Sequence, residues 1–208
     1  MTRLAVSPHR TQAERRAQTR RALLDATIDL LLDRGLGACS LAHVAKRAGL
    51  TTGAVQHHFD TKADLMRAVI TERLFDPSRR TLPPDLADLP LAKRCQEVIV
   101  HQWAYYGDPK YLAIWNIILE GRSDDAITGE VITWQRNGIA AYERALARAF
   151  ADQKLMPRQI KTIQYFINAQ LRGLALLRTI DDNPRILKTQ LNLTADLLEK
   201  HIREIQKG

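Results

Sequence analysis

The sequence has few cysteines and no long apolar run. Its two cysteines, Cys39 and Cys95, lie too far apart in the chain for a zinc knuckle and are too few for a disulfide framework. Such sparse use of cysteine fits a reducing compartment. No apolar run approaches the ~18–20 residues of a membrane span, and the N-terminal residues show no apolar signal-peptide core. We therefore expect a cytoplasmic protein that uses no metal or cofactor.

Acidic residues are outnumbered, and the basic excess is local. The chain of 208 residues has 31 Lys and Arg against 23 Asp and Glu, a net charge of +8. Five units of this excess lie in residues 1–21, where six arginines accompany only Glu14, whereas residues 22–75 are neutral. A basic excess favours a polyanionic partner, most often nucleic acid. The basic segment is either a solvated terminus or an arm that neutralises phosphates and could reach a minor groove.

Helical periodicity runs through the first 75 residues. A capping box, Thr11-Gln12-Ala13-Glu14, begins the first helix, and Gly35 is expected to end it. Three shorter helices are predicted after it. They are residues 41–48 capped by Ser40 and ended by Gly49, a very short helix from Thr51 to near Phe59, and a helix from a second capping box at Thr61 to about Phe75.

Four prolines between residues 76 and 90 interrupt this pattern, and we place a domain boundary there. Five further helices are expected beyond it: residues 91–106, residues 111–118, one capped by Ser123 and running to about residue 149, one opened by Pro157 and one opened by Pro184. The sequence thus predicts an all-α protein of about nine helices with no strand. Residues 1–75 would form a three-helix helix-turn-helix domain with a basic arm, and residues 76–208 a second helical domain.

The short helices on either side of Gly49 have the pattern of a helix-turn-helix motif. Their inner faces would be buried by Leu41, Val44, Ala48, Val55 and Phe59. The second helix is then free to present Thr52, Gln56 and His57. A helix only ~10–12 Å long is useful when its N-terminal end enters a major groove about 12 Å wide.

Residues 20–65 closely resemble the DNA-binding region of the tetracycline-repressor (TetR) family of bacterial transcription regulators. The matching elements are Leu23-Leu24-Asp25-Ala26, Leu32-Asp33-Arg34-Gly35, Ser40-Leu41, Val44-Ala45, Ala48-Gly49-Leu50-Thr51, Gly53, His58-Phe59, Lys62 and Leu65. This chain has Gln56 where the family usually has an aromatic residue that touches the DNA backbone. That phosphate contact is therefore in doubt, and a glutamine can instead bond bidentately to adenine.

The resemblance implies a set of DNA-binding residues. Phosphate contacts would come from Thr51, His58 and Lys62, and Ser40 would cap its helix beside the phosphates. The groove floor would be faced by Thr52, Gly53, Ala54 and His57, with Gln56 beside them. Some of these residues also have structural roles, since Thr51 caps a helix with or without DNA and His58 could be a core imidazole. The family also implies a homodimer on a palindromic operator, released by a small-molecule effector, and a repressor rather than an activator.

Aromatic residues gather in the second region, where all three tryptophans and four of the five tyrosines lie between residues 91 and 150. They either fill a helical core or line an apolar effector pocket with a few polar groups. Gln102 interrupts an apolar stripe, and a buried amide needs partners. The candidate effector-binding residues are Gln102, Trp103, Tyr106, Trp115, Asn116, Glu120, Trp134, Asn137 and Gln170.

The last two helices have apolar stripes too broad for one inner face. We expect them to form an antiparallel hairpin that meets its copy across a twofold axis as a four-helix bundle. The residues expected at this interface are Leu171, Leu174, Leu177, Leu191, Leu198 and Ile202.

Two alternative functions compete with a ligand-controlled regulator. A DNA-binding protein of the same fold could have a filled core in place of a pocket and be regulated by a protein partner. A helical enzyme could use Glu120, Asp124 and Asp125 with a histidine. The sequence has no nucleophile–base spacing, metal motif or glycine-rich phosphate loop, so we do not expect an enzyme.

Overall fold

The computed structural model describes residues 11–74 and 81–207, and within these ranges all regular structure is helical. The predicted all-α class and the nine α-helices are confirmed for this part of the chain. The helices are α1 Gln12–Arg34, α2 Leu41–Ala48, α3 Thr52–Gln56, α4 Lys62–Ala68, α5 Leu91–Tyr106, α6 Lys110–Glu120, α7 Asp125–Ala149, α8 Pro157–Leu177 and α9 Pro184–Ile205. A 3-10 turn, η1 Leu36–Ala38, follows α1, and a π-helical turn, η2 Val69–Leu74, follows α4.

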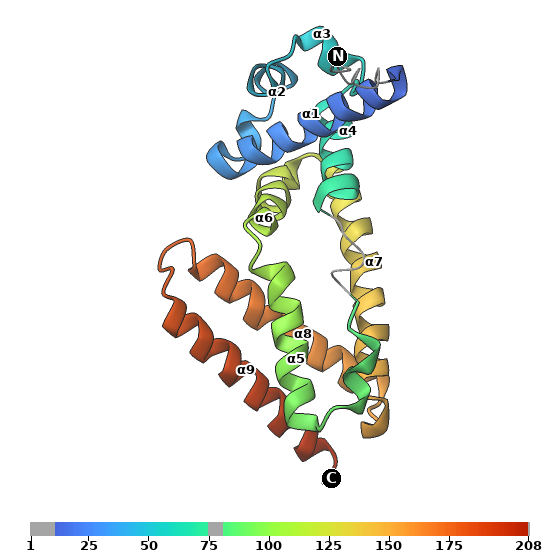
Figure 1. Ribbon diagram of the computed structural model, residues 1–208, viewed down its shortest axis with the longest axis vertical. Helices are drawn as coiled ribbons and strands as arrows, with labels where there is room; N and C mark the ends of the chain where they lie inside the picture. Colours follow the sequence, from blue (N-terminus) through green and yellow to red (C-terminus); the bar gives the residue numbers. More distant parts are fainter. Residues whose placement is uncertain (1–10, 75–80, 208) are drawn as a thin grey trace, which may run out of the picture.

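The molecule is elongated, with its first four helices at one end (Figure 1). There α2 and α3 lie beyond α1, and α6 packs against the inner side of α1. Helices α5 and α7 run along the length of the molecule, and α8 and α9 cross its other end. Helix α5 packs most extensively against α9, and α7 packs against α8. Helix α6 therefore joins the two ends.

The local signals that begin and end the early helices act as predicted. In α1 the Thr11 hydroxyl accepts from the Glu14 amide while the Glu14 carboxylate accepts from the Thr11 amide. A second capping box begins α4. Glycines at positive φ end α1 and α2, at +74° for Gly35 and +69° for Gly49.

Several predicted helix ends were wrong by a few residues. Asp124 rather than Ser123 caps α7, because the Asp124 carboxylate accepts from two amides of the first turn. Helix α3 ends at Gln56, three residues before the expected end near Phe59. Helix α4 ends at Ala68 and continues only as the π-helical turn. Phe75 and the predicted boundary between residues 75 and 76 lie outside the described residues.

A buried arginine fixes the start of α5. Only 4% of the Arg94 side chain is exposed, and its guanidinium donates to the carbonyls of Ala87, Leu89 and Ala149 and pairs with Asp152. These contacts join α5 to the preceding 3-10 turn, Pro84–Asp88, and to the end of α7. The Arg94 guanidinium holds the pKa of Asp152 below its ordinary value.

The apolar faces of α8 and α9 differ from the prediction. Leu171, Leu198 and Ile202 are buried inside the chain, so their expected place at an interface between two copies was wrong. They point inward because α5 packs between the two helices and takes up these faces. The apolar side chains left exposed are Tyr165, Leu176, Leu177, Ile180, Ile186, Leu193 and Leu197.

Candidate DNA-binding site and effector region

Helix α3 is a five-residue helix held in place by its neighbours. Val55 within it and Phe59 just after it are buried in the core, at 0% and 2% exposure. The Thr51 hydroxyl caps α3 by accepting from the Ala54 amide at 3.2 Å. The preceding turn is closed by a hydrogen bond of 2.9 Å from the Leu50 amide to the Ala45 carbonyl. A helix too short to be stable alone is thus fixed by burial and by its cap.

The outer side of α3 presents the residues expected to face the groove. Thr52, Gly53, Gln56 and His57 are exposed, and Ala54 is half-buried. A Cβ added at Gly53 would have the Thr51 hydroxyl as its nearest neighbour, at 4.0 Å. The structure therefore brings five predicted residues together on one open surface. Their hydroxyl, amide and imidazole groups can bond to base edges.

His58 lies half-buried at the edge of this surface, beside a structure that the sequence did not predict. Arg20 donates to the His58 carbonyl at 3.3 Å, stacks over the Phe59 ring at 4.5 Å and pairs with Glu72. Burial, together with the positive charges of Arg16 and Arg20 and with His57, lowers the pKa of His58. At neutral pH this imidazole is uncharged and can offer a phosphate only a neutral hydrogen bond.

Lys62 and Ser40 both make internal hydrogen bonds. The Lys62 ammonium donates to the Leu36 carbonyl at 2.7 Å, which ties the start of α4 to η1. An ammonium has three donors, so two protons are left for a phosphate. The Ser40 hydroxyl accepts from the His43 amide at 3.2 Å, which caps α2 and leaves the hydroxyl proton as a donor. Both residues can contact a phosphate without losing these bonds.

Asn116 and Glu120 lie away from any effector pocket. The Asn116 amide donates to the carbonyl of Leu31 near the end of α1, and the Glu120 carboxylate accepts from the Gly37 amide at 3.2 Å. Both side chains point from α6 toward the DNA-binding end, so the structure does not bring them together with the other residues expected in a pocket. The two residues are one helical turn apart and share a face of α6. They join the two regions of the chain.

The expected aromatic residues form a packed cluster. The rings of Tyr105, Tyr106 and Tyr111 meet edge to face with centroids 4.9–5.4 Å apart, and Trp115 packs on Tyr111 at 6.4 Å. The Tyr106 hydroxyl donates to the Asn168 side chain at 2.6 Å. Burial raises the pKa of Tyr111 well above its ordinary value. Most of this ring surface is core, as stripes at helical spacing usually are.

Three nitrogen donors in or near this cluster, those of Trp115, Gln102 and Arg172, find no acceptor within the described residues. Gln102 is only 1% exposed, and its side-chain nitrogen finds no acceptor within the described residues. Arg172 of α8 was not predicted. Its guanidinium carbon lies 6.0 Å from the Tyr106 ring and 5.7 Å from the Trp115 ring. Its buried Nε likewise finds no acceptor in the described part of the chain. The sequence signal was an arginine directly after Leu171, at the edge of the apolar stripe of α8.

The remaining candidates are scattered. Trp103 packs against Gly107 with the Arg178 guanidinium over its ring at 5.8 Å, and Trp134 is buried elsewhere in the core. Asn137 is exposed on α7. These positions contradict a single pocket built from all nine residues, because their helices direct the side chains to different faces.

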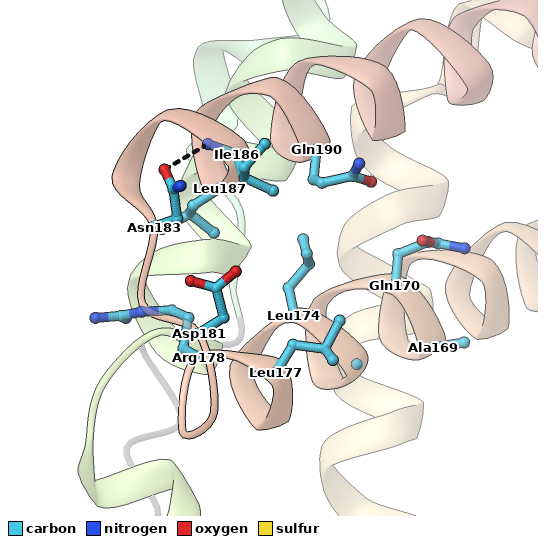
Figure 2. A pocket seen from close by; sticks show the side chains of 11 residues that line it. Ala169, Gln170, Leu174, Leu177, Arg178, Asp181, Asn183, Ile186, Leu187 and Gln190 are labelled. Carbon is cyan, nitrogen blue, oxygen red and sulfur yellow. Dashed lines mark hydrogen bonds between the residues drawn. The ribbon is translucent and has the colours of Figure 1, made fainter.

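Gln170 lines a separate groove of about 360 Å³ between α8 and α9, close to the turn that joins them. Figure 2 shows Leu174 and Leu177 facing Ile186 and Leu187 across this groove, with the Asn183 cap at its edge. Gln170 lies on α8 farther from that turn than Leu174 and Leu177 (Figure 2).

No group of three or more histidine, cysteine, aspartate or glutamate side chains within the described ranges is arranged to hold a metal ion. Both cysteines are buried and free, and burial raises the pKa of Cys39 to about 11 and that of Cys95 to about 12. They are thiols at neutral pH. Among the helices described here, none is long and apolar enough to span a membrane.

Comparison with known proteins agrees with this geometry. Residues 23–69 match the family described as bacterial regulatory proteins, tetR family. An HTH-type transcriptional regulator of Mycobacterium tuberculosis is 25% identical over 91% of this chain and 97% of its own length. The HTH-type transcriptional regulator CymR of Pseudomonas putida is 28% identical over 80% of this chain and 82% of its own length.

The fold also has relatives among solved structures. The transcriptional regulator FadR of Bacillus subtilis, solved in complex with stearoyl-CoA, is similar with a TM-score of 0.64 and 17% identity, over 86% of this chain and 96% of that one. The sequence match covers α3 and the helices that hold it, and the structural match extends over the second helical region. Residues 23–69 therefore carry the DNA-binding region of the TetR family, and the chain as a whole is similar to HTH-type transcription regulators.

Proposed function

We propose that this regulator is a cytoplasmic homodimeric repressor that binds a palindromic operator through α3 and is released by a small-molecule effector. The observation that carries the proposal is the presentation of α3, whose polar side is open while Val55 and Phe59 anchor the other side. One five-residue helix reads too few bases to be specific. Two copies one helical turn (~34 Å) apart would read a palindrome.

Each residue of the surface has a separate proposed role. Gln56 donates to and accepts from an adenine, while Thr52, Gly53, Ala54 and His57 meet the groove floor, where the Ala54 methyl can contact a thymine methyl. Ser40, Thr51, His58 and Lys62 contact phosphates and set the position of α3 on the duplex. These groups occupy one side of the molecule, opposite the end where α8 and α9 cross.

Selection of bound DNA from a random pool tests this function, and a palindromic consensus is the expected result. Lys62→Ala should then weaken binding to all sequences and lower the salt dependence by about one unit. Gln56→Ala should relax specificity at one base pair, at a loss of roughly 1–3 kcal/mol. Lys161→Ala, an exposed lysine of α8, is the control for charge. Wild-type operator binding by both α3-region variants would refute the placement of the interface.

The exposed apolar residues of α8 and α9 support dimerisation through these helices. Leu177 and Ile180 are 59% and 86% exposed, and such side chains in a contiguous patch mark an interaction surface. Leu193→Glu on α9 should convert a dimer to a monomer in sedimentation and weaken operator binding. Val100→Glu is the matched control, because Val100 is 59% exposed on α5. A Leu193→Glu variant that stays dimeric would contradict this interface.

Release by an effector requires contact between the two ends of the molecule. Helix α4 is one route between the two ends, but it is only seven residues long. Helix α6 supports a second route, since its Asn116 and Glu120 hold the end of α1 and η1. FadR, the relative solved with stearoyl-CoA, supports a small molecule as the controlling partner. The effector shifts the equilibrium only by its differential affinity for the two conformations.

A further inference from the structure

Arg172 is a cation without a counter-ion among the residues that the structure describes. It lies on α8 over the rings of Tyr106 and Trp115, and it makes no ion pair or hydrogen bond with the side chains and backbone that the structure describes. Its Nε is fully buried. By contrast Arg178, directly after the end of α8, pairs with Asp182 at 2.8 Å and donates to the Gly107 carbonyl. Burying a charged donor without an acceptor is unfavourable unless something else supplies the acceptor.

The second unmet group is also a donor. Gln102 lies one turn before Tyr106 on the same face of α5, and its buried side-chain nitrogen has no acceptor in the described structure. Stacking on two rings stabilises the guanidinium from its face, but it satisfies none of the N–H groups in the guanidinium plane. These unmet donors, one of them charged, match a ligand rich in acceptors. A carboxylate matches a guanidinium bidentately.

A small cavity lies further along the face of α8 that bears Arg172, and it shares Tyr106 with the surroundings of that arginine. Asn168, Arg172, Ala175 and Thr179 recur at three- and four-residue steps and therefore share one face of α8. Ala175 and Thr179 line a cavity of about 150 Å³ together with Tyr106, Gly107, Pro109 and Leu112, while Asp108 and Arg178 complete its wall. The Asp108 carboxylate accepts from the Lys110 amide at 2.9 Å. Tyr106 thus belongs both to the cavity wall and to the rings under Arg172.

The size of this cavity limits the apolar part of a ligand. A cavity of about 150 Å³ holds a molecule as small as benzene, whereas a long acyl chain would need considerably more room. We propose that the effector is a small monocarboxylate with an apolar body of about one ring, and that Arg172 binds its carboxylate. This inference rests on the proposed function, in which the region binds an effector. Trp115 next to Arg172 provides a fluorescence signal for binding.

Direct titration of the free protein tests the ligand class. The probes are benzoate and hexanoate, each paired with its neutral amide, benzamide and hexanamide. Calorimetry and tryptophan fluorescence should show saturable binding of at least one carboxylate, at least tenfold tighter than its amide. Arg172→Gln should weaken binding of that carboxylate at least tenfold. Arg172→Lys should weaken it less, because a lysine keeps the positive charge but cannot form the bidentate pair. Arg158→Gln, an exposed arginine of α8, should bind as the wild type does.

The outcomes separate the ligand from the regulatory function. The inference is overturned if neither carboxylate binds saturably, or if an Arg172→Gln variant with wild-type circular dichroism and thermal unfolding binds the carboxylate as tightly as the wild type. Operator anisotropy is measured in parallel. Release of DNA by the amides but not by the carboxylates would overturn the inference and leave the proposed function intact. Carboxylate binding without any operator binding would support the inference and refute the proposed function.

Discussion

Gly35 is the residue at which the packing of the two regions can be tested most directly. It ends α1 at φ +74° and ψ −179°, a backbone conformation that is essentially restricted to glycine. A Cβ at Gly35 would lie 2.4 Å from one carboxylate oxygen of Glu120. Gly49 also has a positive φ, but it is in the left-handed region and has nothing within 4 Å of an added Cβ. The two glycines therefore form a matched pair.

The expected loss of stability for Gly35→Ala has two parts. The backbone strain contributes about 1–3 kcal/mol. The Glu120 carboxylate can swing away from the new methyl group, which breaks its hydrogen bond to the Gly37 amide. Because that bond is partly exposed to solvent, its loss contributes only about 0.5–1 kcal/mol. Gly35→Ala should therefore lower the free energy of unfolding by about 1.5–4 kcal/mol, and Gly49→Ala by about 1–2 kcal/mol.

Guanidinium chloride unfolding, followed by circular dichroism, measures both losses. Glu120→Ala in the Gly35→Ala background removes the side chain that the new methyl group would meet, so the two substitutions should couple by about 0.5–1 kcal/mol in a double-mutant cycle. Equal losses for the two glycine variants, together with no coupling to Glu120, would show that α6 does not pack on η1 as described. The reasoning about communication through α6 would then fail too.

Three further substitutions have defined outcomes. Thr51→Ala should lower stability by about 1 kcal/mol by removing the α3 cap and should weaken operator binding, while Thr51→Ser should preserve both. Arg94→Met should lower the free energy of unfolding by about 3–5 kcal/mol because it leaves buried carbonyls and Asp152 without their donor; Arg158→Met should leave it unchanged in the same denaturant assay. The lowered pKa of His58 means that the unfolded chain binds a proton more readily. Stability should therefore fall as pH drops below about 6.5, the ordinary histidine value, and His58→Asn should reduce that slope in unfolding curves at pH 5 and pH 7.5.

The sequence predicted best the local features, which are determined by residues a few positions apart in the chain. Capping boxes, the glycines that end α1 and α2 and the anchoring of α3 by Val55 all follow from local satisfaction of amides and from short apolar spacing. Such features depend little on what the rest of the chain does. The exposure of the groove-facing residues followed directly, because burying one side of so short a helix leaves the other side open.

Contacts between distant segments could not be predicted in the same way. Asn116 and Glu120 look like polar groups for a pocket until α6 is placed against α1. The stripes of α8 and α9 are apolar around most of their circumference, so the sequence could not tell Leu171, which packs inward, from Leu177, which stays exposed. The sequence could not show that Arg172 has no acidic partner among the described residues, because that depends on which helices pack around it. Each of these errors concerns which face of a helix meets which neighbour.

The contacts of α6 also limit how strongly an effector can act on DNA binding. Trp115 lies against Arg172, and the next residue, Asn116, holds the end of α1. A ligand that moves the Trp115 ring therefore acts on an eleven-residue helix that also packs on α1 and is joined to α1 and η1 by the hydrogen bonds of Asn116 and Glu120. Each such bond contributes about 0.5–1.5 kcal/mol net. Altering both therefore changes the free energy of the conformation of the DNA-binding end by about 1–3 kcal/mol. That range corresponds to a change of roughly 5- to 150-fold in operator affinity, enough for release because the effector has only to reduce affinity without unfolding α3.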